Sequence, residues 1–325
     1  MNSVSLPRAR MIELVKRLAP AEGYTQSMLD GVTFMRSNRS IPVTPALYEP
    51  SIVIVLQGKK RGFHGGHRYL YDAGHYLVLS VPLPFVTETE ASEAEPMLGL
   101  ALRINQTLTA QLAMDVDETL SQPPIKPATL YATPLDDKLE DATLRLLEAL
   151  SSPLEAAVLA PSIFREITYR VLISEQGGGL RAALLQSGNF GRIAKVLRSI
   201  HTQYEHSLNV GALAKEANMS IPTFHIHFKA VTNTSPLQYI KAIRLHQARL
   251  LMIREGSSAA TASHRVGYES ASQFSREFKR LFGRSPVEEA RYLKQVLAIA
   301  GPVNEIAAEQ LSCARNRVHP LNHQQ

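Results

Sequence analysis

Hydrophobic and polar positions follow two different spacings along this chain. Between residues 31 and 104, short apolar runs alternate with turn residues such as Gly, Asp and Pro. This pattern predicts antiparallel β-strands of a small barrel or sandwich. The predicted strands are residues 51–57, 68–71, 75–80, 85–89 and 97–104. Residues 58–60 and 72–74 are predicted as turns, and Pro82 and Pro84 are expected to stop the strand that precedes them.

Helical spacing dominates outside this region. Apolar positions recur every three or four residues in 9–18, 135–150 and 154–175, which predicts helices. Pro153 separates the last two, so they are predicted to form a helical hairpin. Gly177, Gly178 and Gly179 follow, and three consecutive glycines predict a linker and a domain boundary. A further helix is predicted for residues 189–204.

The C-terminal third contains an internal repeat. Each copy has the order Phe, Phe, Lys, Ser, Pro. These residues are Phe224, Phe228, Lys229, Ser235 and Pro236 in the first copy, and Phe274, Phe278, Lys279, Ser285 and Pro286 in the second. Ahead of the Phe pair stands Asn218 in one copy and Gly267 in the other, and both residue types tolerate the left-handed backbone of a tight turn.

A helix with a clean start follows each turn. In the second copy, Ser270 with Gln273 three residues later is a capping-box pattern. Phe274 and Phe278 then fall on one helical face, which leaves Arg276 and its basic neighbours to face outward. A helix, a sharp turn and a second helix with a basic outer face is the helix-turn-helix pattern for the DNA major groove. The alternative is that two helical hairpins merely pack together as an all-α core.

Residues 189–293 resemble the AraC/XylS family of transcription regulators. The Phe-Lys and Ser-Pro pairs in both copies carry this resemblance, together with Val266, Gly267 and Tyr268 before the second recognition helix. The resemblance implies two helix-turn-helix units joined by one long helix, here residues 235–255. The two units would enter successive major-groove segments on one face of the duplex.

The chain departs from the family pattern in two places. Ala259 and Ala262 stand where a larger aliphatic residue is usual, so that helix is expected to pack loosely. Ile226 lies near a position where Arg is common, with Pro222 and His227 also predicted to be exposed on the same helix. The first unit is therefore expected to read fewer base edges, or to read thymine methyl groups by apolar contact.

The predicted recognition helices are residues 221–231 and 271–281. The candidate base readers are Thr223 and His225 in the first helix, and Ser272, Gln273 and Arg276 in the second. Arg276 could pair bidentately with guanine, and Gln273 with adenine. The candidate phosphate contacts, which position the protein without specifying sequence, are Lys229, Lys279, Arg280 and Arg284. The two lysines could instead be solvated helix residues, and all four phenylalanines are assigned to the core.

Charge is distributed unevenly between the two halves. Residues 181–325 carry 19 Lys and Arg against 9 Asp and Glu, whereas residues 1–180 carry 16 against 20. A basic half beside an acidic half is what a nucleic-acid-binding domain fused to another domain would give. Cys313 is the only cysteine in the chain, which excludes an intrachain disulfide and suits a reducing compartment. Without a signal region or a long apolar run, the protein is expected to be soluble and cytoplasmic.

The N-terminal half resembles the sensing domain of one branch of the same family, which has a cupin-like barrel. The resemblance covers residues 30–175 and is carried by residues 55–60, 71–76 and 80–84. It implies an effector pocket inside the barrel, whose lining residues the sequence leaves unassigned. It also implies that the helical hairpin forms a dimer interface, although covering the barrel is an equal alternative.

Enzymatic activity is the rival prediction for this half, because cupin-like barrels can be metal enzymes. Such sites need two or three histidines and a carboxylate around one ion. His64, His67 and His75 are the histidines available, and the first two are predicted to be solvated in a Gly-rich surface turn. Ser80 and Ser92 lack the context of a hydrolase nucleophile, and the three glycines lack the Lys of a phosphate-binding loop. No metal, cofactor or catalytic residue is expected.

The sequence therefore predicts an α+β protein with two domains. The first domain is a cupin-like antiparallel β-barrel with a helical hairpin (1–176), and the second is an all-α double helix-turn-helix domain (189–300). A linker (177–188) joins them, and a mobile tail (301–325) follows. The predicted function is sequence-specific transcription regulation, with promoter DNA, a small-molecule effector, RNA polymerase and a second copy as candidate partners. A metal enzyme with a DNA-binding appendage and a ligand-independent DNA-binding dimer are the alternatives.

Overall fold

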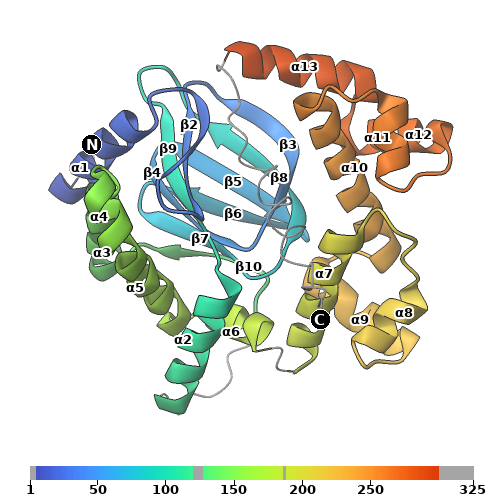
Figure 1. The fold of residues 1–325 in the computed structure, drawn as a ribbon, viewed down its shortest axis with the longest axis horizontal. Helices are drawn as coiled ribbons and strands as arrows, with labels where there is room; N and C mark the ends of the chain where they lie inside the picture. The colour runs from blue at the N-terminus through green and yellow to red at the C-terminus, as the bar shows by residue number, and fades with distance from the viewer. Residues whose placement is uncertain (1–4, 120–126, 186–187, 300–325) are drawn as a thin grey trace, which may run out of the picture.

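The structure is a computed structural model that describes residues 5–119, 127–185 and 188–299. Within these residues, a β-rich N-terminal half lies beside an all-helical C-terminal half (Figure 1). The predicted α+β class, with an antiparallel β domain followed by a helical domain, is confirmed. The domain limits remain predictions, and the tail predicted for 301–325 lies outside the described residues.

The β domain is made of two sheets. The described strands are β1 (Gly23–Gln26), β2 (Val32–Ser37), β3 (Ile41–Tyr48), β4 (Ser51–Gln57), β5 (Lys59–His64), β6 (His67–Asp72), β7 (His75–Leu79), β8 (Leu83–Glu90), β9 (Met97–Arg103) and β10 (Leu130–Pro134). Six strands pair in the order β1-β2-β9-β4-β7-β10, and four in the order β3-β8-β5-β6. Every pairing is antiparallel. Apolar residues on the facing sides of both sheets belong to one cluster, so the sheets enclose a common interior.

The six-stranded sheet is buried on both of its faces. Side chains alternate between the two faces of a strand. In β4, Ile52 and Ile54 therefore pack in the cluster formed with the N-terminal helices, whereas Val53 and Val55 pack in the interior cluster between the sheets. This double burial explains why β4 reads as a continuous apolar run and not as an alternating pattern.

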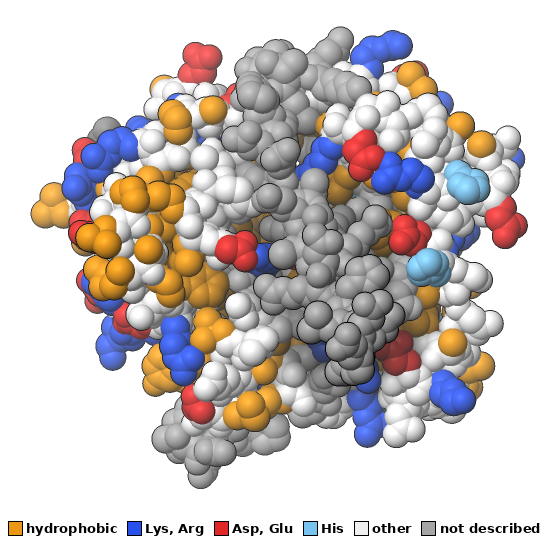
Figure 2. Space-filling model, in the orientation of Figure 1, with side chains coloured by type: hydrophobic (Ala, Val, Ile, Leu, Met, Phe, Trp, Pro, Cys, Tyr) orange, Lys and Arg blue, Asp and Glu red, His pale blue; other side chains and the backbone are white. Residues whose placement is uncertain are grey.

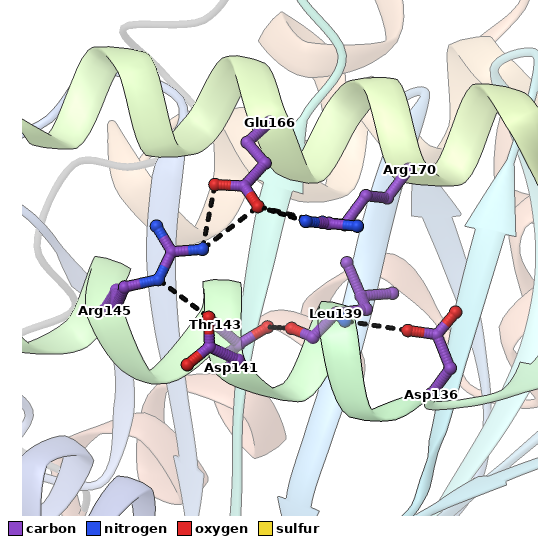
Figure 3. Close-up of polar contacts among 7 residues, drawn as sticks. All are labelled: Asp136, Leu139, Asp141, Thr143, Arg145, Glu166 and Arg170. Carbon is purple, nitrogen blue, oxygen red and sulfur yellow. Dashed lines mark hydrogen bonds and ion pairs between the residues drawn. The ribbon is translucent and has the colours of Figure 1, made fainter.

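Helices cover the outer face of this sheet. They are α1 (Leu6–Leu18), α2 (Gln106–Thr119), α3 (Asp137–Ala149), α4 (Pro153–Val158), α5 (Ala160–Ile173) and α6 (Gly178–Leu184). The predicted hairpin corresponds to α3 against α4 and α5, because the predicted helix 154–175 is divided at Leu159. Arg145 of α3 donates to Asp141 at 2.8 Å and to Glu166 of α5 at 2.9 Å, and Arg170 also donates to Glu166 at 2.9 Å (Figure 3). The bond between Arg145 and Glu166 connects the two long helices of the hairpin, and the other two lie within α3 and α5.

The hairpin also leaves apolar side chains on the surface. Figure 2 shows hydrophobic side chains gathered on the side where α3, α4 and α5 lie. Leu154, Val158 and Leu159 are exposed there. The packing of α3 and α5 against the sheet shows that the hairpin covers the barrel, while its use as a dimer interface remains a prediction.

Two details of the predicted strands are wrong. Lys59 and Lys60 belong to β5 and not to a turn, because Gly58 alone, at φ +76°, separates β5 from β4. Pro84 lies inside β8 and does not end a strand. It pairs with Leu47 of β3 at a point before β8 meets β5, and a proline without an N–H is tolerated where a strand lacks one neighbour. No strand was predicted for β1, β2, β3, β5 or β10.

The three consecutive glycines are not a flexible linker. Gly177, Gly178 and Gly179 are buried at the start of α6. A Cβ at Gly177 would lie 2.2 Å from the carbonyl oxygen of Leu172, and one at Gly179 would lie 2.2 Å from that of Ala128. Gly177 and Gly179 therefore allow close packing of backbones, a role that local sequence cannot distinguish from flexibility.

The C-terminal half contains both predicted repeats. Its helices are α7 (Gly188–Gln203), α8 (Val210–Glu216), α9 (Ile221–Thr232), α10 (Pro236–Arg254), α11 (Ala259–Arg265), α12 (Ala271–Phe282) and α13 (Pro286–Ile299). Helices α8 and α9 form the first helix-turn-helix unit, α11 and α12 form the second, and α10 joins them. Ala262 is fully buried in α11, so this departure from the family pattern does not leave that position open. No described helix is both long and apolar enough to cross a membrane.

The first unit packs directly on the β domain. Phe228 and Tyr239 share one apolar cluster with Leu79 and Leu83 of the sandwich interior. The Tyr239 hydroxyl donates to the carbonyl oxygen of Pro82 at 2.7 Å. The second unit has an apolar cluster of its own, in which every described buried residue comes from the C-terminal half. The two repeats therefore have different relations to the N-terminal domain.

A histidine and a glutamate also meet at this boundary. Glu49 Oε1 lies 3.4 Å from Nδ1 of His201 in α7, while Nε2 of His201 lies 2.9 Å from the Tyr239 hydroxyl. The Tyr239 proton goes to Pro82, so Nε2 must be the donor to that hydroxyl. Burial would raise the pKa of Glu49, but the close contact with the His201 ring, and the charges of His201 and Arg103, lower it overall.

We therefore expect the Glu49 contact to stabilise the fold only above acidic pH. The pKa of this carboxyl is lower in the folded than in the unfolded state, so its contribution is present above the ordinary value of about 4.5 and is lost as pH falls through the folded pKa. Glu49→Gln should lower the urea midpoint near pH 7 and have little effect near pH 3, with the exposed Glu93→Gln as control. An equal effect of Glu49→Gln at both pH values would contradict this prediction.

Candidate nucleic-acid interface

Local sequence signals fix the start and end of both recognition helices. The Ser220 and Ser270 side chains accept hydrogen bonds from the N–H groups of the third residues of α9 and α12. At the other end, Asn233 at φ 56° and Gly283 at φ 79° adopt the left-handed cap. Both helices are 12 residues long, so the repeat in sequence becomes a repeat in structure.

The phenylalanine pairs hold each recognition helix on its core. The rings of Phe224 and Phe228 lie 5.3 Å apart, and those of Phe274 and Phe278 lie 5.4 Å apart. All four side chains are buried, as predicted. Because they occupy one face, the opposite face of each helix points away from the core.

An arginine that the sequence analysis missed holds the second unit and the segment after α7 on α10. Arg244 of α10 donates to three backbone carbonyl oxygens: Tyr204 at 2.8 Å, His206 at 2.8 Å and Gly267 at 3.0 Å. Gly267, at φ +84°, is the turn residue of the second unit. One guanidinium thus fixes the end of α7 and the turn before α12 to the joining helix, and its planar set of donors suits this task. The three acceptors are distant in sequence, so no local signal identifies it.

The outer face of α12 presents the predicted polar residues. Ser272, Gln273 and Arg276 are all exposed. Gln273 donates its side-chain N–H to Glu277 at 3.2 Å instead of bonding back to its cap residue, so the predicted capping box is only half formed. DNA would have to compete with Glu277 for this amide.

Glu277 anchors the second recognition helix. Its carboxylate accepts from Lys241 of α10 at 2.7 Å and from the Tyr268 hydroxyl at 2.7 Å. Burial would raise the pKa of Glu277, but the hydrogen bonds from Lys241, Tyr268 and Gln273 outweigh burial and lower it. The helix therefore keeps a fixed rotation relative to α10, and Arg276 next to Glu277 is held on the exposed side.

The first recognition helix presents a different surface. Thr223 and His225 are exposed, and Ile226 is 68% exposed. Thr223 shares a hydrogen bond of 2.8 Å with the cap residue Ser220. His227 is half-buried and not exposed as predicted, because its Nε2 lies 3.0 Å from the side chain of Asn189 in α7. The face of α9 is thus less charged than that of α12.

The candidate phosphate contacts fall into two groups. Lys229, Lys279 and Arg280 are exposed on their helices. Arg284 is exposed as well, but it donates to Glu289 at 3.1 Å and lies over the ring of Tyr292 at 3.9 Å. Its side chain is therefore already engaged in the free protein.

The histidines of the β domain do not converge on one point. His64 and His67 face each other at the end of the β5–β6 hairpin, while His75 lies 2.7 Å from Asp72. Contrary to prediction, only His67 is solvated, because His64 is half-buried and its Nε2 atom has no partner. Burial, followed by the charge of His67, lowers the pKa of His64. The described residues contain no group of three or more His, Cys, Asp or Glu side chains able to hold a metal ion.

Comparison with known families gives an independent view of the same two regions. The family model described as AraC-type transcriptional regulator N-terminus matches residues 28–179, and a helix-turn-helix domain model matches residues 213–292. The chain belongs to the AraC-type family of transcriptional regulators. The N-terminal match also covers the β domain, for which the sequence motifs were less specific.

Curated relatives agree with this AraC-type assignment, and a solved structure shares the fold. The chain is 35% identical over 94 residues to the Msm operon regulatory protein of Streptococcus mutans, covering 29% of this chain and 34% of that protein. It is 25% identical over 141 residues to the activator RhaS of Pectobacterium atrosepticum, covering 42% and 48%. It thus spans between a third and a half of these relatives. The fatty-acid-bound structure of ToxT from Vibrio cholerae has the same fold, with a TM-score of 0.54, 13% identity and coverage of 83% and 96%.

Proposed function

We propose that this AraC-type regulator binds promoter DNA sequence-specifically by placing α9 and α12 in two successive major-groove segments. The observation that carries this proposal is the pair of capped helices, each held by buried phenylalanines and presenting an exposed polar face. Base reading is assigned to Thr223 and His225 in α9, and to Ser272, Gln273 and Arg276 in α12. Phosphate contacts are assigned to Lys229, Lys279 and Arg280. Arg284 could contact a phosphate only after its hydrogen bond to Glu289 is broken.

Selection of a random-sequence DNA library at near-physiological salt tests this proposal. Two enriched half-sites about one helical turn apart would support reading by both units. A single half-site would show that α9, with exposed Ile226, contributes little base reading. Absence of any enriched sequence, with and without effector candidates, would contradict the proposal.

Arg276→Ala is expected to weaken binding to the selected site by about 1–3 kcal/mol and to relax specificity at one base pair. Lys279→Ala, on the same helix, should weaken binding to all sequences alike and reduce the salt dependence. Competition binding with a set of single-base variants of the site separates the two effects. Equal losses on every sequence for Arg276→Ala would show that Arg276 contacts phosphate.

We also propose that the β domain binds a small-molecule effector. ToxT, whose fold this chain shares, has been solved with an unsaturated fatty acid bound. An effector can change DNA binding only through different affinity for two states of the protein. Its affinity for the protein should therefore differ with and without operator DNA. Equal affinities would leave the domain a purely structural or dimerising role.

The remaining partners and the cellular location belong to the same proposal. A regulator of this kind acts in the cytoplasm, where promoter DNA is found, and RNA polymerase and a second copy of the chain are its expected partners. We propose no enzymatic activity. Ultracentrifugation of the free protein tests the dimer, and the exposed side chains of α4 are the first to substitute.

A further inference from the structure

The β domain contains a lysine that is buried without an acidic partner. Lys60 of β5 is 4% exposed, and its ammonium donates to the Thr89 hydroxyl at 3.1 Å. Among the described residues, no carboxylate forms an ion pair with it. Its neighbours Lys59 and Arg61 point to the other face of the strand and pair with Glu88 and Glu90.

Such a lysine is costly to the folded protein. A buried charge is normally paired, since water no longer solvates it and a single neutral hydroxyl replaces only part of that solvation. Burial lowers the pKa of Lys60, and Tyr24 opposes this effect. A residue that costs stability and is surrounded by polar groups is a candidate for binding.

Hydroxyl groups surround the ammonium. Tyr71 lies opposite Lys60 in the neighbouring strand β6, is fully buried and has no hydrogen-bond partner for its hydroxyl. Tyr24 and Tyr48 lie close enough to these groups to influence their ionisation, because the Tyr48 hydroxyl raises the pKa of Tyr24 and the charge of Lys60 lowers it. Tyr24 is also 50% exposed, so the cluster reaches the surface at this residue.

The DNA-binding half contributes to the same cluster. Arg249 of α10 donates to the Pro45 carbonyl oxygen of β3 at 3.1 Å, and its charge lowers the pKa of Tyr24. Its Nε atom is buried without a partner. A ligand bound among the tyrosines would therefore lie next to the helix that joins the two helix-turn-helix units.

We propose that Lys60, with the hydroxyls of Tyr24, Tyr48 and Tyr71, binds the carboxylate of a small organic acid. This site is the effector site of the proposed function, and so rests on it. Arg249 is already paired with Glu289 at 3.5 Å, so among the described residues of this cluster Lys60 is the cation without an acidic partner. One such ammonium suits a monoanion, whereas a phosphate dianion calls for more cationic donors. The facing side of the six-stranded sheet supplies Met35 and Val53, which favours an apolar body for the acid.

The test compares acids with their uncharged counterparts. Octanoate, decanoate and benzoate are titrated into the full-length protein by calorimetry, beside octanol, decanol and benzyl alcohol. We expect at least one acid to bind and to raise the thermal midpoint, and its alcohol to bind roughly 10- to 100-fold more weakly. Equal affinity of acid and alcohol, or no binding by any acid, would overturn the proposal.

Two variants separate binding from folding. Lys60→Met should reduce acid affinity by roughly the same 10- to 100-fold, and without ligand it should melt at the same or a higher temperature, because an unpaired buried charge is removed. Lys59→Met, which removes the exposed neighbour, should bind the acid as the wild type does. Loss of folding in Lys60→Met, or its unchanged acid affinity, would show that Lys60 is structural.

DNA selection and acid binding together distinguish a wrong carboxylate site from a wrong regulator proposal. DNA selection by wild type and by Lys60→Met is measured without ligand in both cases. Sequence-specific DNA binding with no preference for acids would overturn only the carboxylate site. Acid binding with no DNA preference would leave the site in place and overturn the proposed function.

Discussion

Gly267→Ala is expected to destabilise the second helix-turn-helix unit by about 2–5 kcal/mol, whereas Gly283→Ala should cost only about 1–2 kcal/mol. Both glycines lie in the second unit and both have a left-handed backbone, at φ +84° and +79°. An alanine at either position therefore suffers the same backbone strain. The two positions differ in what surrounds the added methyl group.

Crowding accounts for the larger effect at Gly267. A Cβ there would lie 2.7 Å from the Glu205 carbonyl oxygen and 3.2 Å from the guanidinium carbon of Arg244, while a Cβ at Gly283 would meet no atom within 4 Å. The backbone would have to move at the point where Arg244 fixes the turn. We therefore expect Gly267→Ala also to remove the contribution of α12 to DNA binding.

Urea unfolding followed by circular dichroism, with footprinting of the selected site, measures both quantities. Each variant serves as the control for the other, because both replace Gly by Ala at a residue with a left-handed backbone conformation. Equal destabilisation by the two substitutions would mean that strain alone acts at Gly267 and that the close approach to Glu205 relaxes freely.

Phe228→Ala and Phe278→Ala should each cost about 3–5 kcal/mol, but we expect them to loosen different parts of the molecule. The two residues occupy the same position in the repeat and are both fully buried. Phe228 packs with Tyr239 in the cluster that includes the sandwich interior. Phe278 packs with Phe282 in the separate cluster of the second unit.

Hydrogen exchange resolves the two outcomes by segment. Phe228→Ala should accelerate exchange in α9, in the first half of α10 and in the strands β7 and β8 that share its cluster. Phe278→Ala should accelerate exchange in the second half of α10 and in α11, α12 and α13, but not in the β-strands. The exposed Ile226→Ala serves as control for α9. Identical exchange patterns for the two phenylalanine variants would contradict the division into two clusters.

Local chemistry made the DNA-binding half predictable. Cap residues, left-handed turn positions and phenylalanines four residues apart each act within one or two helical turns, so the sequence is enough to locate α9 and α12. The same reasoning placed Arg276 and Lys279 on the exposed side. It placed His227 wrongly, because the contact with Asn189 depends on how α7 crosses α9.

The β domain was less predictable for a physical reason. A strand of mixed residues can present either face to the core, and only pairing with neighbours decides which. The register of β5 with β6 and β8 turns Lys60 inward beside Tyr71 and Thr89, and leaves Lys59 outside. From the sequence alone, both lysines were predicted to lie in a turn.

The sequence by itself determined the two repeated units, their recognition helices and the succession of a β domain and a helical domain, because short-range capping, periodicity and turn chemistry specify them. Only the tertiary structure decided the position of Arg244, the burial of Lys60 among tyrosines and the docking of the first unit on the sandwich. Each of these joins residues far apart in the chain, and such contacts arise from packing that no local pattern encodes.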